Sequence, residues 1–129
     1  MMPTPFHLCL EIKSDFGYLP FLTQIFKILK TPKAPQLTQI LIEAYNNAVL
    51  HAHKRNKKKW VTIDILLTPK QARIQVIDRG KGIKNAHHRK TVSLYSTHGR
   101  GMKLIQAAAD KMTSRHKNGC HIFEAKCFL

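Results

Sequence analysis

Two runs of β-forming residues, separated by one short turn, constrain the fold of this chain most. The first run, "WVTIDILLTP" (Trp60–Pro69), places Val61, Ile63 and Ile65 on one face, and the second run, "RIQVID", ends at Asp78. Alternation of this kind is typical of strands that bury one face. Because only "PKQA" lies between the two runs, we expect the strands to pair antiparallel.

The flanking segments predict further strands and helices. A leading strand should cover residues 6–12, and a helix capped by Ser14 or Asp15 should run through Leu29. A second helix is expected over residues 36–53 and a third over residues 101–110, before a closing hairpin that turns at Asn118–Gly119. The apolar stripe of the second helix consists of Leu37, Ile40, Leu41, Ala44 and Ala48.

This order of elements predicts one domain over residues 1–129. Strands joined by tight turns favour antiparallel pairing, and the helices then have one sheet face to cover. The expected fold class is therefore α+β: a two-layer sandwich in which about three helices cover one face of a mixed, mostly antiparallel sheet.

Charge is the unusual feature of the composition. The chain has 22 Lys and Arg against 7 Asp and Glu, a formal net charge of +15. Such a chain attracts polyanions, including nucleotides, nucleic acid, acidic proteins and anionic lipid. The densest run, "KRNKKK" at residues 54–59, has two interpretations: a solvated turn after a helix, or a patch that binds polyanions.

The cysteines and the hydropathy pattern indicate a cytoplasmic protein. Cys9, Cys120 and Cys127 make an odd count without metal-binding spacing, so we expect reduced, buried thiols. No apolar run approaches the ~20 residues that span a bilayer, and the N-terminus does not resemble a secretory signal. We therefore expect no membrane association.

A polar stripe lies on the second predicted helix. Within "LIEAYNNAVLHAH", Glu43, Asn47 and His51 follow one another at intervals of four, which keeps them near one helix face. A carboxylate and an amide oxygen suit Mg²⁺, and the carboxylate could act as a general base. The alternative is a solvent-exposed helix edge, although the neighbouring Ala44 and Ala48 place Glu43 at the rim of the core. His51 is interpreted as a structural polar group.

Two glycine-containing turns follow. "DRGKG" begins at Asp78, where glycines let the backbone turn tightly and approach a ligand while the carboxylate accepts from an amino group. "GRG" (Gly99–Gly101) precedes a helix, whose free N–H groups can bind an anion. The alternatives are an Asp-capped glycine turn for the first motif and a flexible hinge with an N-cap for the second.

The order of these motifs resembles the histidine-kinase-like ATPase superfamily, which has the Bergerat fold. That order is E-x-x-x-N on a helix, D-x-G-x-G after a strand, a variable loop and G-x-G opening a helix. Within the superfamily, "EAYNNAVLHAH", "VIDRGKGI" and "GRGMKLIQAAAD" are most similar to the anti-sigma-factor serine/threonine kinases. This resemblance covers nearly the whole chain.

The resemblance implies ATP and Mg²⁺ as ligands and assigns roles to the motif residues. Asn47 would hold Mg²⁺ between the phosphates, Glu43 would orient or deprotonate the nucleophile, and Asp78 would accept from the adenine amino group. The segment 83–98 would be a lid over the nucleotide. The expected nucleotide-binding residues are Asn47, Asp78, Gly80, Gly82, Ile83, Gly99, Arg100, Gly101 and Met102.

The implied function is that of an ATP-dependent protein serine/threonine kinase. It would transfer the γ-phosphate to an antagonist protein and sequester a sigma factor, with a homodimer as a further option. Such kinases often carry an arginine shortly before the glycine pair, where this chain has Thr97 and His98. One alternative is therefore an ATP-binding module that sequesters without turnover.

A basic nucleic-acid-binding domain is a second alternative. Only Trp60 stands beside the lysine run, and no recognition helix or series of stacking aromatics is evident, so this alternative is not favoured.

Overall fold

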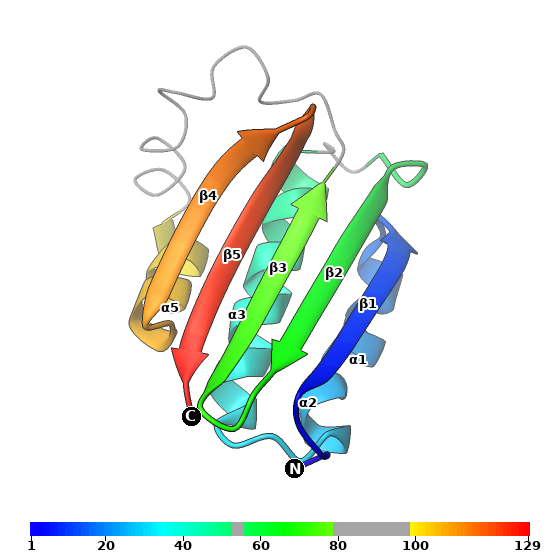
Figure 1. The fold of residues 1–129 in the computed structure, drawn as a ribbon. Helices are drawn as coiled ribbons and strands as arrows, with labels where there is room; N and C mark the ends of the chain where they lie inside the picture. Colours follow the sequence, from blue (N-terminus) through cyan, green and yellow to red (C-terminus); the bar gives the residue numbers. More distant parts are fainter. Residues whose placement is uncertain (53–55, 79–98) are drawn as a thin grey trace.

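The computed structural model describes residues 1–52, 56–78 and 99–129 (Figure 1). The described part contains a five-stranded sheet with the strand order β1-β2-β3-β5-β4. All four pairings between neighbouring strands are antiparallel. The α+β class is confirmed. The prediction allowed for a mixed, mostly antiparallel sheet, and the described sheet is entirely antiparallel. The strands are β1 (Phe6–Lys13), β2 (Trp60–Leu67), β3 (Gln71–Asp78), β4 (Lys111–Lys117) and β5 (Cys120–Phe128).

Alternation along the strands separates a buried face from a polar face. On β2, Val61, Ile63, Ile65 and Leu67 are all fully buried, whereas Asp64, between them, faces the other way and remains partly exposed. The helices lie on the buried side of the sheet (Figure 1). The sequence pattern thus predicts both the pairing of β2 with β3 and the side that the helices cover.

Two tight turns fix the hairpins. The Thr68 backbone nitrogen donates to the Gln71 carbonyl at 2.8 Å, which closes the β2–β3 turn. In the β4–β5 turn, Asn118 and Gly119 have φ values of 53° and 78°. Two consecutive positive φ angles match the right-handed twist of a hairpin, and Asn-Gly adopts them easily. The predicted position of this turn is therefore correct.

The first predicted helix is broken into short pieces. The chain forms a 3₁₀ turn at Phe16–Tyr18, then α1 (Leu19–Leu22) and α2 (Ile25–Ile28). The Thr23 hydroxyl donates to the Pro20 carbonyl at 2.7 Å, which takes up the acceptor that a continuous helix would use for Gln24. The Gln24 backbone nitrogen instead bonds to the carbonyl of Phe21. The prediction of one continuous helix was wrong for this reason.

The two longer helices lie close to their predicted positions. Helix α3 covers Ala34–Asn47 and continues as a π-helical segment over Ala48–Ala52, and α5 covers Gly99–Ala108. The predicted apolar stripe of α3 is buried along its whole length. No helix in the described ranges is long and apolar enough to cross a membrane. All three thiols are free, but only Cys127 is buried, so the expectation of buried thiols was wrong for the exposed Cys9.

Candidate functional site

Hydrogen bonds at both ends of α3 set its direction across the sheet. Near its first residue, the Lys33 ammonium donates to the Phe128 carbonyl at 2.7 Å, at the end of β5. Near its last turn, the Tyr45 hydroxyl lies 2.6 Å from the Lys13 carbonyl oxygen and 2.9 Å from the Asp15 backbone nitrogen, where β1 ends. The C-terminal turn of α3 therefore lies at the end of the sheet where β1 ends.

Asp78 lies at this same end of the sheet. In the strand register, Lys13 at the end of β1 pairs with Trp60, the first residue of β2, and the next residue, Val61, pairs with Asp78. Asp78 is thus the last residue of β3, and β3 ends at the end of the sheet where the last turn of α3 lies (Figure 1). The structure brings the second-helix motif and the first residue of "DRGKG" to one end of the molecule.

Helix α5 points its N-terminus toward that end as well. Just beyond the helix, the Asp110 backbone nitrogen donates to the Lys126 carbonyl at 2.9 Å, and the Asp110 carboxylate accepts from the Phe128 backbone nitrogen at 2.6 Å. These bonds hold the C-terminal end of α5 at the opposite end of the sheet. Because α5 packs beside α3, Gly99–Met102 form a first turn directed toward the end that carries Asp78 (Figure 1). The helix begins at Gly99, two residues before its predicted start.

The polar residues of α3 lie partly inside the protein. Glu43 and Asn47 are half-buried, which agrees with the predicted position of Glu43 at the rim of the core. Among the residues that the structure describes, the Asn47 Nδ2 and the Asn46 Oδ1 are buried without a hydrogen-bond partner. An unpaired buried polar atom costs about 1–3 kcal/mol, so these atoms require a partner from a ligand, from water or from elsewhere in the chain.

Asp78 is the most buried of the predicted site residues whose surroundings can be described. Its side chain is 2% exposed, and its Oδ2 lies 3.3 Å from the Nδ1 of His121. The other ring nitrogen of His121, Nε2, bonds to the Ser114 hydroxyl. The ring of His116 lies against that of His121, with 5.1 Å between the centroids. Asp78 therefore ends β3 inside a small polar cluster.

The sequence interpretation missed His121 and Ser114. Both lie in the closing hairpin, which was treated only as structure. His121 pairs with Asp78 because β5 adds to β3, and β4 in turn brings Ser114 close to His121. Local spacing carries no signal for contacts between residues 43 positions apart. The β3–β5 register would have identified His121, and the β4–β5 register would have identified Ser114.

Several predicted positions lie outside the described residues. These are Gly80, Gly82, Ile83 and the expected lid at about residues 83–98. For Gly99, Arg100, Gly101 and Met102, the structure describes the helical backbone. Their predicted contacts with nucleotide remain predictions.

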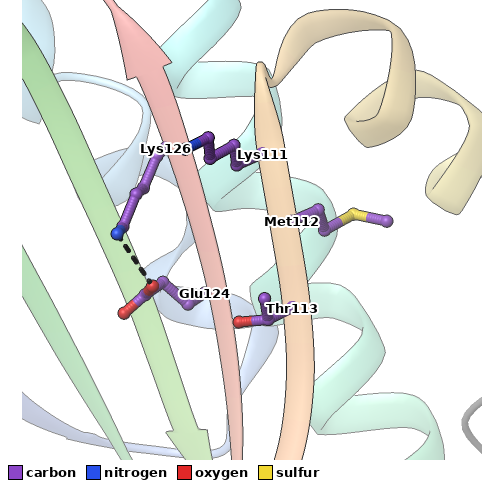
Figure 2. Close-up of a pocket in the computed structure, with 5 residues that line it drawn as sticks. All are labelled: Lys111, Met112, Thr113, Glu124 and Lys126. Carbon is purple, nitrogen blue, oxygen red and sulfur yellow. Dashed lines mark ion pairs between the residues drawn. The ribbon is translucent and has the colours of Figure 1, made fainter.

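A shallow hollow on β4 and β5 is separate from this site. It is lined by Lys111, Met112, Thr113, Glu124 and Lys126 (Figure 2). Lys111 pairs with Lys126 at one end of the hairpin, whereas His116 pairs with His121 near the other end, beside Asp78. The hollow measures about 60 Å³, far below the ~300 Å³ of a small ligand pocket. We therefore assign no ligand to it.

Comparison with known families agrees with the motifs and the fold. The chain matches the model of the histidine kinase-like ATPase domain over residues 22–124. No curated protein matches the chain. Because the match spans most of the sequence, the chain belongs to the histidine kinase-like ATPase family. It is by family an ATP-binding domain, and the resemblance seen in the sequence is confirmed at this level.

Proposed function

We propose that this protein is an ATP-dependent protein serine/threonine kinase. The observation that carries the proposal is the convergence of the three motif-bearing elements at one end of the sheet. The C-terminal turn of α3, the last residue of β3 and the first turn of α5 all face that end (Figure 1). Phosphoryl transfer depends mainly on positioning and on charge stabilisation, which such a convergence can provide.

The residues present fit a nucleotide with Mg²⁺. The Asn47 amide offers an oxygen to the metal, and its Nδ2, which lacks a partner among the described residues, can donate to a phosphate oxygen. Mg²⁺ commonly keeps several waters and takes only one or two protein ligands beside the phosphates, where it supplies positive charge. In the described ranges no cluster of three or more His, Cys, Asp or Glu side chains could hold a metal.

Asp78, Glu43 and the first turn of α5 have distinct roles under this proposal. Asp78 accepts a hydrogen bond from the adenine amino group. Glu43, one helical turn from Asn47, orients the attacking hydroxyl and accepts its proton. The first turn of α5 presents backbone N–H groups to the phosphates.

The partners follow from the resemblance to the anti-sigma-factor kinases. A protein antagonist would receive the phosphate, and a sigma factor would be sequestered. The free thiols and the use of ATP suit the cytoplasm as the location. One observation favours sequestration without turnover as the second candidate: Thr97 and His98 stand where such kinases often carry an arginine.

Substitution of Glu43 by Gln separates these two candidates. Glu43→Gln keeps the size and hydrogen bonding of the side chain but removes its basicity, so ATP affinity should change little. Phosphate transfer to a candidate antagonist, or slow ATP hydrolysis, should fall about 10²–10⁴-fold. Glu11→Gln, which alters an exposed carboxylate on β1, serves as the matched control and should leave both quantities unchanged.

Asn47→Ala should behave differently from Glu43→Gln. It removes a metal ligand, so Mg²⁺-dependent ATP binding itself should weaken. Melting temperatures measured without nucleotide show whether either variant has simply lost packing. If the parent binds ATP but neither transfers its phosphate nor hydrolyses ATP, the kinase assignment is wrong and sequestration alone remains.

A further inference from the structure

A chain of hydrogen bonds connects Asp78 with two residues outside the family motifs. His121 Nδ1 lies 3.3 Å from the Oδ2 of Asp78, and His121 Nε2 contacts the Ser114 hydroxyl. The three side chains come from β3, β5 and β4, which are neighbours in the sheet. The His121 side chain is only 13% exposed. This cluster is therefore built into the sheet beside the predicted nucleotide site.

Both ring nitrogens of His121 have a hydrogen-bond partner. A carboxylate accepts hydrogen bonds, so the His121 Nδ1–H donates to Asp78. The Ser114 hydroxyl can donate or accept, so it is a suitable partner for Nε2 with either role of that nitrogen. The ring of His116 packs against His121 at an interplanar angle of 43°. The imidazole is thus held at both nitrogens and along one side.

The bond from His121 constrains the carboxylate of Asp78. A buried carboxylate needs hydrogen bonds to offset its loss of hydration. A carboxylate can accept about four such bonds, of which His121 supplies one. With Oδ2 held by a fixed ring, the plane of the carboxylate is fixed as well. Its remaining acceptor directions are then set before a ligand arrives.

We propose that His121, held by Ser114, is a positioning residue that aims the Asp78 carboxylate at the exocyclic amino group of adenine. This inference rests on the proposed role of Asp78 in the nucleotide site. The order of atoms is that of a Ser-His-Asp relay. Here, however, the carboxylate is the group that meets the ligand, so the serine and histidine orient it.

The consequence of this arrangement is selectivity for the base. Adenine presents an amino donor at carbon 6, whereas guanine and hypoxanthine present a carbonyl acceptor there. A fixed carboxylate facing a carbonyl places two acceptors together, and a buried mismatch of this kind is strongly rejected. A carboxylate free to rotate would discriminate less well. His121 should therefore contribute to selection of adenine as well as to affinity.

The test compares ADP with the diphosphate of purine riboside, which lacks the amino group. Calorimetry measures the affinity of both nucleotides for the parent and for His121→Leu. His121→Leu should weaken ADP binding about tenfold, because the Asp78 carboxylate is no longer held in the orientation that meets the amino group. The analogue should bind both proteins equally well, within about twofold. Asp78→Asn provides the reference loss of the amino contact.

Two further variants guard against a purely structural effect. Asn can place an N–H donor near the position of Nδ1, so His121→Asn should recover most of the ADP affinity. Ser114→Ala should cause a smaller loss, again for ADP and not for the analogue. Melting temperatures without nucleotide identify any variant that has lost stability.

The outcomes separate this inference from the proposed function. If His121→Leu weakens ADP and the analogue by the same factor, or if His121→Asn does not recover ADP binding, the positioning role is wrong and the nucleotide site stands. If the parent binds no ADP, both the site and the positioning role are wrong. A loss confined to ADP, with recovery by Asn, supports the role of His121.

Discussion

The Tyr45 hydroxyl lies 2.9 Å from the backbone nitrogen of Asp15, which fastens the last turn of α3 to the segment that follows β1. The same hydroxyl lies within hydrogen-bonding distance of the carbonyl oxygens of Lys13 and Asp15. It therefore accepts from one backbone group and donates to another. Because Tyr45 is fully buried and only two residues from Asn47, this contact also positions the predicted metal ligand.

Tyr45→Phe tests this anchor. Removal of the hydroxyl leaves the Asp15 N–H and two carbonyl groups without this partner, so the free energy of unfolding should fall by about 1–3 kcal/mol. Urea denaturation measures the change. Tyr18→Phe is the matched control. Because Tyr18 is 37% exposed, removal of its hydroxyl should leave the free energy of unfolding almost unchanged. An unchanged urea midpoint for Tyr45→Phe would show that the hydroxyl is not an anchor.

Alkaline pH should weaken the same anchor. Burial raises the pKa of Tyr45 above its ordinary value of 10.0, with a smaller increase from the Asp15 charge. The native state therefore keeps a proton that the unfolded state loses near pH ~10. This contribution to stability is complete below pH ~10 and disappears as pH rises through the native pKa. The stability difference between the parent and Tyr45→Phe should shrink above pH ~10, and a constant difference would contradict the assignment.

The sequence predicts most of the fold because the main signals are local. Alternation along β2 and β3 identifies the buried face, and the Asn118–Gly119 turn is specified by two residues that tolerate positive φ. The break between α1 and α2 was missed because it depends on the Thr23 hydroxyl, which takes the carbonyl of Pro20. Helix propensity does not indicate which of two donors a carbonyl will accept.

The candidate site likewise contains residues that the sequence predicts and residues that it does not. The spacing of Glu43 and Asn47 on one helix is a local property, and Glu43 lies at the core rim as expected. The pairing of His121 with Asp78 depends on β5 joining β3, and the contact with Ser114 depends on the β4–β5 register. The pairing with Asp78 is long-range and follows from the packing of the whole sheet, so motif spacing could not reveal it, whereas the contact with Ser114 lies within the hairpin whose turn was predicted.

The three thiols should differ in reactivity. Cys9 is exposed on β1, whereas Cys127 is buried and burial raises the pKa of its thiol, with a smaller increase from the charge of Asp110. The thiolate is the reactive form, so native Cys127 should react much more slowly than Cys9. Brief alkylation followed by peptide mass spectrometry measures each site. Equal labelling of Cys9 and Cys127 in the native protein would contradict the burial of Cys127, and labelling in urea is the control.

A final prediction concerns the basic turn and the nucleic-acid alternative. Trp60 is the only tryptophan and is 47% exposed. The Lys13 ammonium lies 4.0 Å from the centroid of its ring. It adjoins a turn in which Lys57 and Lys58 are exposed, which agrees with a solvated turn for this part of the lysine run. Trp60 fluorescence therefore reports on any polyanion that binds there. A single-stranded oligonucleotide should quench it only at low salt, with no saturable binding at about 0.15 M ionic strength.

Site-specific binding of nucleic acid would give a different result. Base stacking on Trp60 would produce saturable quenching that persists at about 0.15 M salt, and Trp60→Ala would weaken it by roughly 1–3 kcal/mol per stacked base. Under the kinase proposal, Trp60→Ala should leave ADP affinity unchanged, because Trp60 begins β2 on the sheet face opposite the helices. Calorimetry with ADP on the same variant provides this control. Persistent quenching that Trp60→Ala removes, together with no ADP binding by the parent, would favour the nucleic-acid-binding alternative.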